Sequence, residues 1–519
     1  MNRSIFGSIR SNAPGKNAFD LSHERKQSMN MGDLVPILTQ EVVPGDSFKV
    51  NSEIFMRRSP MIAPMMHRVN CYTHYFFVPN RIIWDEWELF VTGGEDGTEA
   101  PVIPRLNLSE ANKQYFKKGS LADYMGLPIL DQTTTLQTQT TCSALPFRAV
   151  QEIFNEYYRD QNLQPAVPFS KGSGSADSDI AELTQLRKRA WEKDYFTSAL
   201  PFAQRGGEVG IPVDFNYKPT SQVLNTDGSP IGTDDNLSAS NGSVPPGGLI
   251  SNPGGSAKNA RIENLEEEGV SVSITELRKS ARLQEYLELM ARGGSRYIEQ
   301  LKALFNVTSS DARLQRPEYL GGGKSPVVIS EVLSTVSDSN AQDFPPQGTM
   351  SGHGISVGKS NTFKKRFEEH GHIIGFMSVL PRTAYQQGIN KMWKRYDKFD
   401  HYIPQFAHIG EQEIKNEELY YDYQTPSAPL DETFGYQSRY AEYKYKESSV
   451  HGDFRDSLNY WHMGRIFDAQ PNLNANFVTS DPTQRVFAVT DPDEHKLYVQ
   501  IYNRIKAIRP MPYYSDPKL

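Results

Sequence analysis

Apolar and alternating stretches predict strands in the first and last thirds of the chain. Residues 34–43 (LVPILTQEVV) and 69–78 (VNCYTHYFFV) are rich in β-branched and aromatic residues and are followed by turn-forming residues. Residues 371–380 run apolar up to a proline, and residues 485–490 suggest a further short strand. In residues 496–502, apolar positions alternate with polar and tyrosine positions, which is the period of a strand with one buried face.

Helical periodicity occurs between these strands. Residues 147–159 (FRAVQEIFNEYYR) place apolar side chains on one face of a helix. Residues 273–291 begin with Ser273 and Glu276, the two residues of a capping box, and residues 297–305 suggest a second helix. Because strands and helices do not alternate regularly, the pattern favours an antiparallel two-sheet sandwich over a parallel sheet. A jelly roll is a sandwich of this kind and has long loops at its corners.

The clearest break in composition covers residues 206–255. This segment holds ten glycines and six prolines, and its only aromatic residues are Phe215 and Tyr217. Its acidic residues outnumber its basic ones by five to one. Such a segment buries too little apolar surface to offset the entropy that it loses on ordering. We therefore predict a long exposed insertion, or one that neighbouring copies hold in place.

The overall composition fits a β core with many loops. Of 519 residues, 38% are hydrophobic, and there are 38 glycines and 33 prolines. The 26 Phe, 26 Tyr and 5 Trp suit either an aromatic core or protein interfaces. Cys71 and Cys142 allow at most one disulfide and no cysteine-based zinc site. We find neither a signal-peptide core nor an apolar run of the ~20 residues that span a bilayer, and expect a soluble protein that folds in a reducing cytoplasm.

Charge is distributed unevenly along the chain. The net charge is −7, which argues against a simple nucleic-acid binder, but residues 1–30 carry +3 and residues 496–519 carry +4. We expect residues 1–30 to form an arm and not a packed element. Basic arms often contact phosphates, and ordinary solvated ends are the alternative. The candidates for contact with DNA are Arg3, Arg10, Lys16, Arg25, Lys26, Arg504, Lys506 and Arg509.

Three short motifs match only part of a catalytic or ligand-binding pattern. Residues 354–358 (GISVG) match the nucleophile elbow of hydrolases, but their flanks indicate a glycine–serine loop. Residues 321–325 (GGGKS) resemble the end of a phosphate-binding loop, but Glu318 stands where its first glycine belongs, so a flexible turn is favoured. His370 and His372 have no accompanying metal ligands in the sequence. We therefore expect no enzymatic activity, no metal and no cofactor.

A tyrosine-rich segment at residues 420–445 has two interpretations. Its side chains cover the core at a strand edge, as a monomer would favour, or they anchor contacts between subunits. The candidates for subunit contact are Tyr420, Tyr421, Tyr423, Tyr436 and Tyr440.

Many blocks resemble the major capsid protein of gokushovirus-type Microviridae, in the same order and nearly from end to end. Before the insertion they are residues 34–37 (LVPI), 43–48 (VPGDSF), 76–81 (FFVPNR), 84–87 (WDEW), 145–148 (LPFR), 154–156 (FNE) and 159–163 (RDQNL). After it they are residues 291–297 (ARGGSRY), 311–321 (DARLQRPEYLG), 369–375 (EHGHIIG), 385–388 (YQQG), 406–411 (FAHIGE), 435–442 (GYQSRYAE) and 509–512 (RPMP).

The resemblance implies a mainly β fold, an eight-stranded antiparallel jelly roll of the viral capsid type with long loops, short helices and one large surface insertion. It implies a structural protein of the virion, which self-assembles in the host bacterial cytoplasm into a T=1 icosahedral capsid around a circular ssDNA genome. An internal scaffolding protein and a minor pilot protein are the implied partners of this bacteriophage protein. The insertion is implied to form a protrusion at threefold axes and to attach to a host surface receptor.

The resemblance also divides the chain into segments. Residues 1–205 hold the N-terminal arm and the first part of the jelly roll, residues 206–272 the insertion, and residues 273–519 a helical segment, the remaining strands and the C-terminal arm. We recognise no family motif within the insertion, where the candidates for host attachment are Asp227, Asp234, Asp235 and Asn236. A jelly-roll hydrolase or carbohydrate-binding protein, suggested by residues 354–358 and the aromatic content, is the alternative.

Overall fold

The structure is a computed structural model, and the residues that it describes are mainly β. They are residues 15–207, 209, 222–225, 237–238, 250–251, 258–263, 274–293, 316–333, 350–359, 362–425 and 428–514. Neighbouring strands pair antiparallel in every sheet of the described residues. The chain divides into two compact units, Met1–Ala203 with Gly294–Leu519, and Gln204–Gly293.

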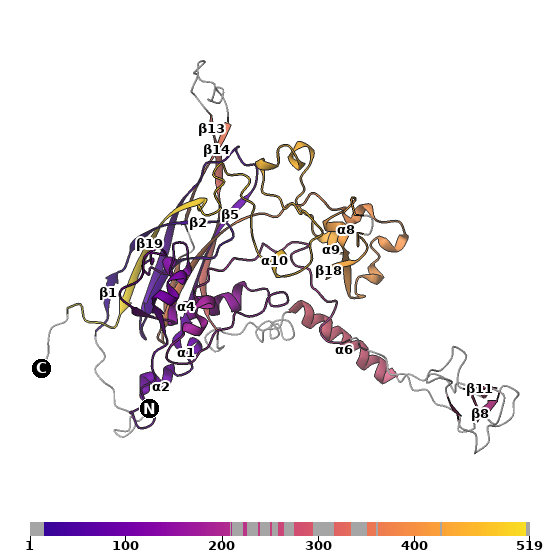
Figure 1. Cartoon of the computed structure of the whole chain (residues 1–519), viewed down its shortest axis with the longest axis horizontal. Coiled ribbons are helices and arrows are strands. Elements are labelled where there is room, and N and C mark those ends of the chain that lie inside the picture. Colours follow the sequence, from indigo (N-terminus) through magenta and orange to yellow (C-terminus); the bar gives the residue numbers. More distant parts are fainter. Residues whose placement is uncertain are drawn as a thin grey trace, which may run out of the picture. The chain divides into compact units, whose positions relative to one another are not determined.

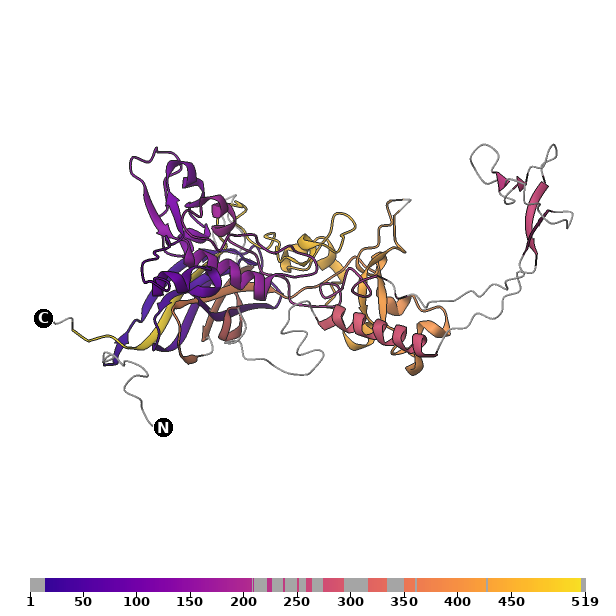
Figure 2. The ribbon, with the colours of Figure 1, turned by 90° about the horizontal axis from the view of Figure 1, so that it is seen from below.

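The first sheet of the larger unit joins the two ends of the chain. Its order is β1-β19-β4-β14-β13, with β2 also paired to β19 and β15 also paired to β4. The strands are β1 (Asn17–Asp20), β2 (His23–Met29), β4 (Ser47–Arg58), β13 (Val328–Leu333), β14 (Met350–Lys359), β15 (Phe363–Arg366) and β19 (Leu497–Arg509). Figures 1 and 2 show the yellow β19 lying beside the indigo N-terminal strands. Buried and exposed residues alternate along β19 from Leu497 to Ile508, so this sheet has one face on the core and one exposed face.

The second sheet is covered on both faces. Its order is β12-β5-β16-β3, and its strands are β3 (Val35–Val42), β5 (Val69–Pro79), β12 (Glu318–Pro326) and β16 (Gly371–Pro381). Every residue of β16 is buried. Ile373 and Met377 pack in the core shared with the first sheet, whereas Ile374 and Phe376 pack in a second core on the opposite face. The uninterrupted apolar pattern of residues 69–78 and 371–380 therefore results from burial on both faces.

Short helices cover the outer face of the second sheet. They are α1 (Asn80–Ile83), α2 (Trp87–Thr92), α3 (Leu121–Tyr124), α4 (Leu145–Ile153) and α5 (Ile180–Leu183), with the antiparallel pair of β6 (Arg105–Leu108) and β7 (Thr140–Ser143) beside them. A π-helical turn (Phe154–Tyr158) continues α4. The buried Arg148 guanidinium donates hydrogen bonds to the carbonyls of Ile83 (3.2 Å) and Gly172 (2.9 Å). These bonds connect α4 to α1 and to the loop that contains Gly172.

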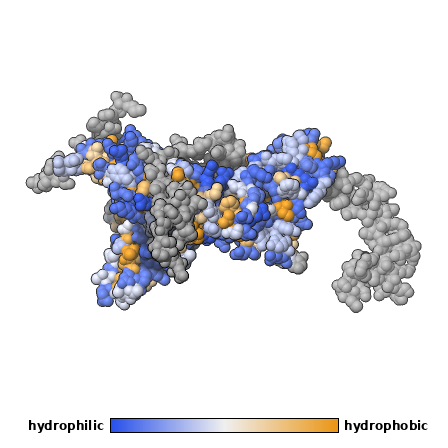
Figure 3. Space-filling view, turned by 90° about the horizontal axis from the view of Figure 1, so that it is seen from above, coloured by the Kyte–Doolittle hydropathy of each residue, from blue (hydrophilic) through white to orange (hydrophobic). Residues whose placement is uncertain are grey.

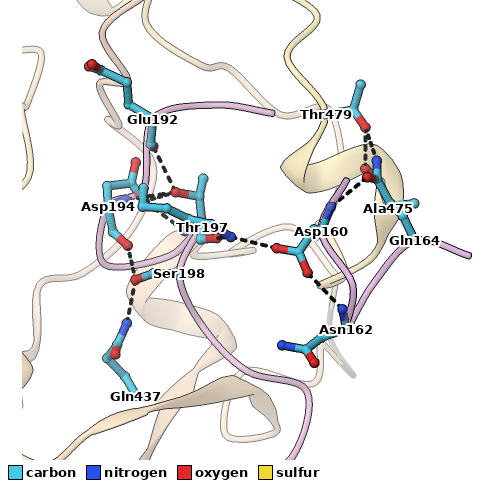
Figure 4. Close-up of polar contacts among 11 residues, drawn as sticks. Asp160, Asn162, Gln164, Glu192, Asp194, Thr197, Ser198, Gln437, Ala475 and Thr479 are labelled. Atoms are coloured by element: carbon cyan, nitrogen blue, oxygen red, sulfur yellow. Dashed lines mark hydrogen bonds and ion pairs between the residues drawn. The ribbon is translucent and has the colours of Figure 1, made fainter. Parts of the chain in front are cut away.

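A third core packs residues 195–199 against segments from the C-terminal part of the chain. Its elements are β17 (Glu411–Lys415), α8 (Asn416–Leu419), β18 (Thr433–Ser438), α9 (Ala441–Lys444) and α10 (Ala475–Val478). A polar network lies beside this core (Figure 4). In it, Gln437 donates to Ser198 Oγ (2.8 Å), and Gln164 donates to Thr479 Oγ1 (2.8 Å).

The smaller unit contains a sheet and a helix. The described strands β8 (Gln222–Asn225), β9 (Leu237–Ser238), β10 (Ile250–Ser251) and β11 (Lys258–Glu263) follow the order β8-β11-β10-β9. Helix α6 (Ile274–Gly293) confirms the helix predicted at residues 273–291. Ser273 of the predicted capping box and the second helix at residues 297–305 lie outside the described residues.

Most predicted elements of the larger unit are confirmed, and one strand is wrong. Residues 34–43, 69–78, 371–380 and 496–502 correspond to β3, β5, β16 and the first half of β19, and residues 147–159 are helical as α4 and the π-helical turn. Residues 485–490 instead form a turn, with a single bridge from Phe487 to Met61. Val486 and Phe487 are buried in the main core, so their apolar character reflects burial without strand pairing.

The prediction of an unpacked arm at residues 1–30 is wrong for residues 17–29. These residues form β1 and β2, which both pair with β19. The sequence of β2 (HERKQSM) is polar, but its only large apolar side chain, Met29, is fully buried. A strand at a sheet edge gains its backbone hydrogen bonds from its neighbour, so a polar sequence still pairs there. Residues 1–14 lie outside the described residues.

Both glycine-rich motifs also lie in strands. Residues 354–358, expected in a loop, lie inside β14, and residues 321–325, expected in a turn, lie inside β12. At Gly322, a Cβ atom would stand 2.4 Å from the carbonyl oxygen of Thr73. The glycine at that position therefore permits close approach of β12 to β5.

Candidate functional site

Several predicted DNA contacts lie on or beside the exposed face of the first sheet. Lys26 on β2 and Arg504 and Lys506 on β19 are exposed, and their register places them on the face opposite the core. Lys16 is exposed just before β1. Arg3 and Arg10 lie outside the described residues. The fold thus brings basic residues from the two ends of the chain onto one surface.

Two other predicted DNA contacts take part in contacts within the chain. The Arg25 guanidinium donates to the carbonyl of Tyr124, and burial lowers its pKa. Arg509 forms an ion pair with the buried carboxylate of Asp46 at 3.0 Å. Their contact with DNA stays a prediction, while the structure gives both a part in holding the fold.

Sequence reasoning missed the basic residues that β4 and β15 add to this face. Lys49 of β4 stands opposite Lys506 in the register, and Lys364 of β15 stands opposite Lys49. Both side chains are exposed. Lys364 lies in a short basic run (KKR, residues 364–366) that was a local signal, whereas Lys49 has no basic neighbour in its part of β4. Only strand pairing brings the two lysines together.

The candidate tyrosines separate into exposed and buried members. Tyr423 is 76% exposed and Tyr421 is also exposed, whereas Tyr440 is only 4% exposed. The Tyr440 hydroxyl accepts a hydrogen bond from the backbone amide of Ile403 (3.3 Å). Tyr420 and Tyr436 are half-buried. Both interpretations of the tyrosine-rich segment therefore have suitable residues, and the role of all five in subunit contact stays a prediction.

Further exposed aromatic side chains lie in residues 393–402. Single hydrophobic residues are scattered over the face shown in Figure 3, so amphipathic aromatic residues are a better guide to contact regions. We use the name aromatic surface for a set of exposed side chains, namely those of Trp393, Tyr396, Phe399, Tyr402, Tyr421, Tyr423 and Tyr443. Of these, Trp393 is 68% exposed. Four of these residues, Trp393, Tyr396, Phe399 and Tyr402, lie three residues apart in the sequence. This spacing was the available signal, but it lies before the tyrosine-rich segment at residues 420–445 and was missed.

A pocket of about 470 Å³ beside the third core is lined by carboxylates. Glu418, Glu442 and Glu447 line it together with Lys391, which is 3.8 Å from Glu418 Oε1. The Tyr195 hydroxyl donates to Glu418 (3.0 Å). Burial raises the pKa of Glu418 and of Glu447. These groups have partners within the chain, which suits a structural role.

The motifs considered for catalysis lack catalytic geometry. Ser356 is paired with Met56 in the interior of the strand ladder, whereas a nucleophile elbow needs a turn between a strand and a helix. Burial lowers the pKa of His372 to about 4. Among the described residues, no three His, Cys, Asp or Glu side chains are placed to hold a metal ion. Burial also raises the pKa of Cys71 to about 12 and that of Cys142 to about 11, so both are thiols near neutral pH.

Two further predictions concern attachment to the host and the absence of a membrane-spanning segment. The candidates for host attachment, Asp227, Asp234, Asp235 and Asn236, lie outside the described residues. Within the described part of the chain, none of the helices combines the length and the apolar character needed to cross a membrane.

Comparisons with known proteins cover nearly the whole chain. Residues 7–519 match the family of the phage capsid protein (F protein). The capsid protein VP1 of Chlamydia phage 1 is 34% identical, over 97% of this chain and 96% of the relative. The capsid protein VP1 of Bdellovibrio phage phiMH2K is 34% identical, over 99% and 98%, and that of Spiroplasma virus 4 is 31% identical, over 99% and 97%. This chain therefore belongs to the capsid protein (F protein) family of the Microviridae.

Proposed function

We propose that this chain, a major capsid protein of the virion and not an enzyme, assembles into a T=1 icosahedral shell around a circular single-stranded DNA genome. The supporting observation is the similarity to phage capsid proteins over nearly the full length of both chains. Membership of the family gives self-assembly, and the shell geometry and its contents are the proposed part. Assembly takes place in the cytoplasm of the host bacterium.

We also propose that the two packed sheets are an eight-stranded jelly roll. Along the chain, β2, β4, β14 with β15, and β19 belong to the first sheet, and β3, β5, β12 and β16 belong to the second. In the first sheet β19 lies between β2 and β4, and in the second β16 lies between β3 and β5. The chain therefore crosses repeatedly between the sheets, which is the connectivity of two Greek keys. In this assignment β1 and β13 are additions to the eight strands.

The aromatic surface suits contacts between copies of the chain. Aromatic side chains bury a large area and keep a polar tip hydrated, so they often anchor interfaces. A standard interface buries ~1,600 Å² in total, and closure of a shell makes the association of each subunit multivalent. Individually weak contacts then suffice for a stable shell, and they let misplaced subunits leave during assembly. Tyr421 and Tyr423 are the predicted contacts that the aromatic surface includes.

The remaining partners are proposed from the family resemblance. An internal scaffolding protein assists assembly, and a minor pilot protein accompanies the genome. The basic residues Lys16, Lys26, Arg504 and Lys506 face the interior, where the phosphates of the genome lie. Support for this orientation is their exposure on or beside one sheet face.

Residues 206–272 are proposed to form the surface protrusion at threefold axes and to attach to a host receptor. Residues 1–205 and 273–519 then supply the jelly roll, its helical loops and both terminal arms. Support comes from the glycine- and proline-rich composition of the insertion and from the compact unit formed by Gln204–Gly293. Deleting residues 206–255 should leave particle formation intact and abolish adsorption to the host. Failure to form particles would give the insertion a structural role instead.

Assembly itself is tested by co-expression with the scaffolding partner, followed by sedimentation and electron microscopy. Closed particles with icosahedral symmetry are the expected result. Only monomers, under conditions in which related shells assemble, would contradict the proposal. Particles with another triangulation number would contradict the T=1 geometry alone.

A further inference from the structure

Three lysines stand side by side across the exposed face of the first sheet. Lys506 of β19 is opposite Lys49 of β4, and Lys49 is opposite Lys364 of β15. Directly opposite residues on one face have Cβ atoms ~5 Å apart, and like charges at that distance destabilise a sheet. One carboxylate, Asp20 of β1, stands at the end of this row, opposite Lys506. Within the described strands, one acidic partner in the register leaves the row with an excess of positive charge.

The basic excess extends over the whole exposed face. We use the name basic sheet face for the charged residues of β1, β2, β4, β15 and β19 that lie on the side of the sheet opposite the core, as judged from the register and from exposure. It contains seven basic and three acidic residues, so its net charge is +4, whereas the net charge of the whole chain is −7. The basic residues are Lys26, Lys49, Arg57, Lys364, Arg366, Arg504 and Lys506, and the acidic ones are Asp20, Glu24 and Glu53. A concentration of one sign on an otherwise acidic chain indicates a polyanionic partner.

Two exposed tyrosines on the same face narrow the class of polyanion. Tyr498 is 46% exposed and Tyr502 is 37% exposed. Along β19, Tyr502 precedes Arg504 by two residues and Lys506 by four, so all three side chains point the same way at intervals of ~7 Å. Exposed aromatic rings beside basic groups allow bases to stack while phosphates pair with the cations. Double-stranded DNA keeps its bases stacked inside the helix, so this combination favours single strands.

We propose that the basic sheet face binds single-stranded nucleic acid, with Lys49, Lys364 and Lys506 on the phosphates and with Tyr498 and Tyr502 stacking on bases. The inference rests on the proposed enclosure of single-stranded DNA and assigns a particular surface to it. Binding of this kind is independent of base sequence, because neither charge pairing nor stacking reads base edges. Binding also relieves the repulsion within the lysine row.

The test measures binding of a fluorescent oligothymidylate to the purified, unassembled full-length chain by anisotropy over a series of salt concentrations. Each phosphate contact contributes about 0.7 to the slope of log K against log salt for single strands. The triple variant Lys49→Gln, Lys364→Gln and Lys506→Gln should therefore flatten the slope by about 2. The control variant Lys117→Gln, Lys118→Gln and Lys444→Gln removes the same charge from exposed lysines elsewhere and should change the slope by much less. Equal slopes for the two triple variants would overturn the proposal.

A second pair of variants separates stacking from charge. Tyr502→Leu should weaken oligothymidylate binding by roughly fivefold or more, and Tyr502→Phe, which keeps the ring, should not. Binding of inorganic polyphosphate, which has no bases, should be the same for both. If Tyr502→Leu weakens both ligands equally, or neither, the stacking role is wrong.

Particle formation distinguishes this inference from the proposed function. Shells that form normally from the lysine triple variant but contain less DNA are the expected outcome. If the wild-type chain binds no oligonucleotide and the triple variant no longer assembles, the basic sheet face contacts protein, and the inference fails while assembly stands. If the wild-type chain forms no shell, the proposed function fails, and the binding result still decides the role of this face.

Discussion

Replacing Asp194 should destabilise the third core in a way that depends on the replacing residue. Asp194 is 5% exposed, and its carboxylate accepts five hydrogen bonds. Oδ1 accepts from the backbone amides of Phe196 (3.0 Å) and Thr197 (2.8 Å) and from the Thr197 hydroxyl (3.0 Å). Oδ2 accepts from the hydroxyls of Thr383 (2.6 Å) and Tyr385 (2.7 Å). The carboxylate thereby joins the turn at residues 194–198 (Figure 4) to the segment that follows β16.

The magnitude follows from the donors that each variant leaves without an acceptor. Alanine removes both oxygens, and a buried donor without a partner costs about 1–3 kcal/mol. The Thr197 hydroxyl retains the Glu192 carbonyl as an acceptor (3.1 Å), which reduces the loss. We expect Asp194→Ala to lower the local free energy of opening by about 3–5 kcal/mol. Asp194→Asn keeps Oδ1, and the two hydroxyls can turn to accept from the new amide, so its effect should be about 1–2 kcal/mol.

Hydrogen–deuterium exchange on the full-length chain measures these free energies at the amides concerned. Exchange at Phe196, at Thr197 and in β18 should speed up in the alanine variant, while exchange in β5, which belongs to the other cores, serves as the internal reference. A change below about 1 kcal/mol for alanine would refute the reasoning. An asparagine variant as unstable as the alanine variant would show that packing, and not the hydrogen bonds, holds this turn.

Three further predictions concern assembly, pH and packing. Trp393→Ala and Tyr423→Ala should leave the Tm unchanged, because both side chains are exposed. Each should weaken the association of subunits by about 2 kcal/mol, as expected of a residue that anchors a contact. Sedimentation measures the loss of particles, and normal particle yields would contradict the prediction. Burial raises the pKa of Asp33 to about 6, so the folded chain binds this proton more tightly and loses stability as pH rises from about 4 to 6. Asp33→Asn should therefore raise the free energy of unfolding by up to about 3 kcal/mol at pH 7 and change it little below pH ~4; a benefit independent of pH would refute this. Gly375→Ala places a Cβ 2.8 Å from Tyr75 Cε1 and should lower the free energy of unfolding in urea by about 1–3 kcal/mol. An unchanged unfolding midpoint would show that the Tyr75 ring moves aside freely.

Strands that are buried on both faces could be predicted from sequence because their pattern is local. Residues 69–78 and 371–380 carry apolar side chains at nearly every position, and they became β5 and β16. The alternation in residues 496–502 likewise gave the face of β19 that meets the core. The family resemblance gave the class of protein, because its blocks extend nearly from end to end and the comparisons cover the same length.

Other features could not be predicted, because they depend on partners that are distant in sequence. β2 is a polar strand that exists through pairing with β19, and Val486 and Phe487 are apolar residues that are buried without forming a strand. Tyr440 looked like Tyr423 in the sequence, yet one is in the core and the other in solvent. Burial of a single side chain depends on what packs over it, and no local pattern encodes that.

By itself, then, the sequence determined the strands at the centre of the second sheet, the basic character of both ends and membership of the capsid family. Tertiary structure alone decided which polar segments pair at the sheet edge and which charges meet across strands. Lys49, Lys364 and Lys506 are neighbours only because β15, β4 and β19 pair in one register. Hydrophobic periodicity is a property of a short segment, whereas register depends on the hydrogen bonds and packing between segments that are distant in sequence.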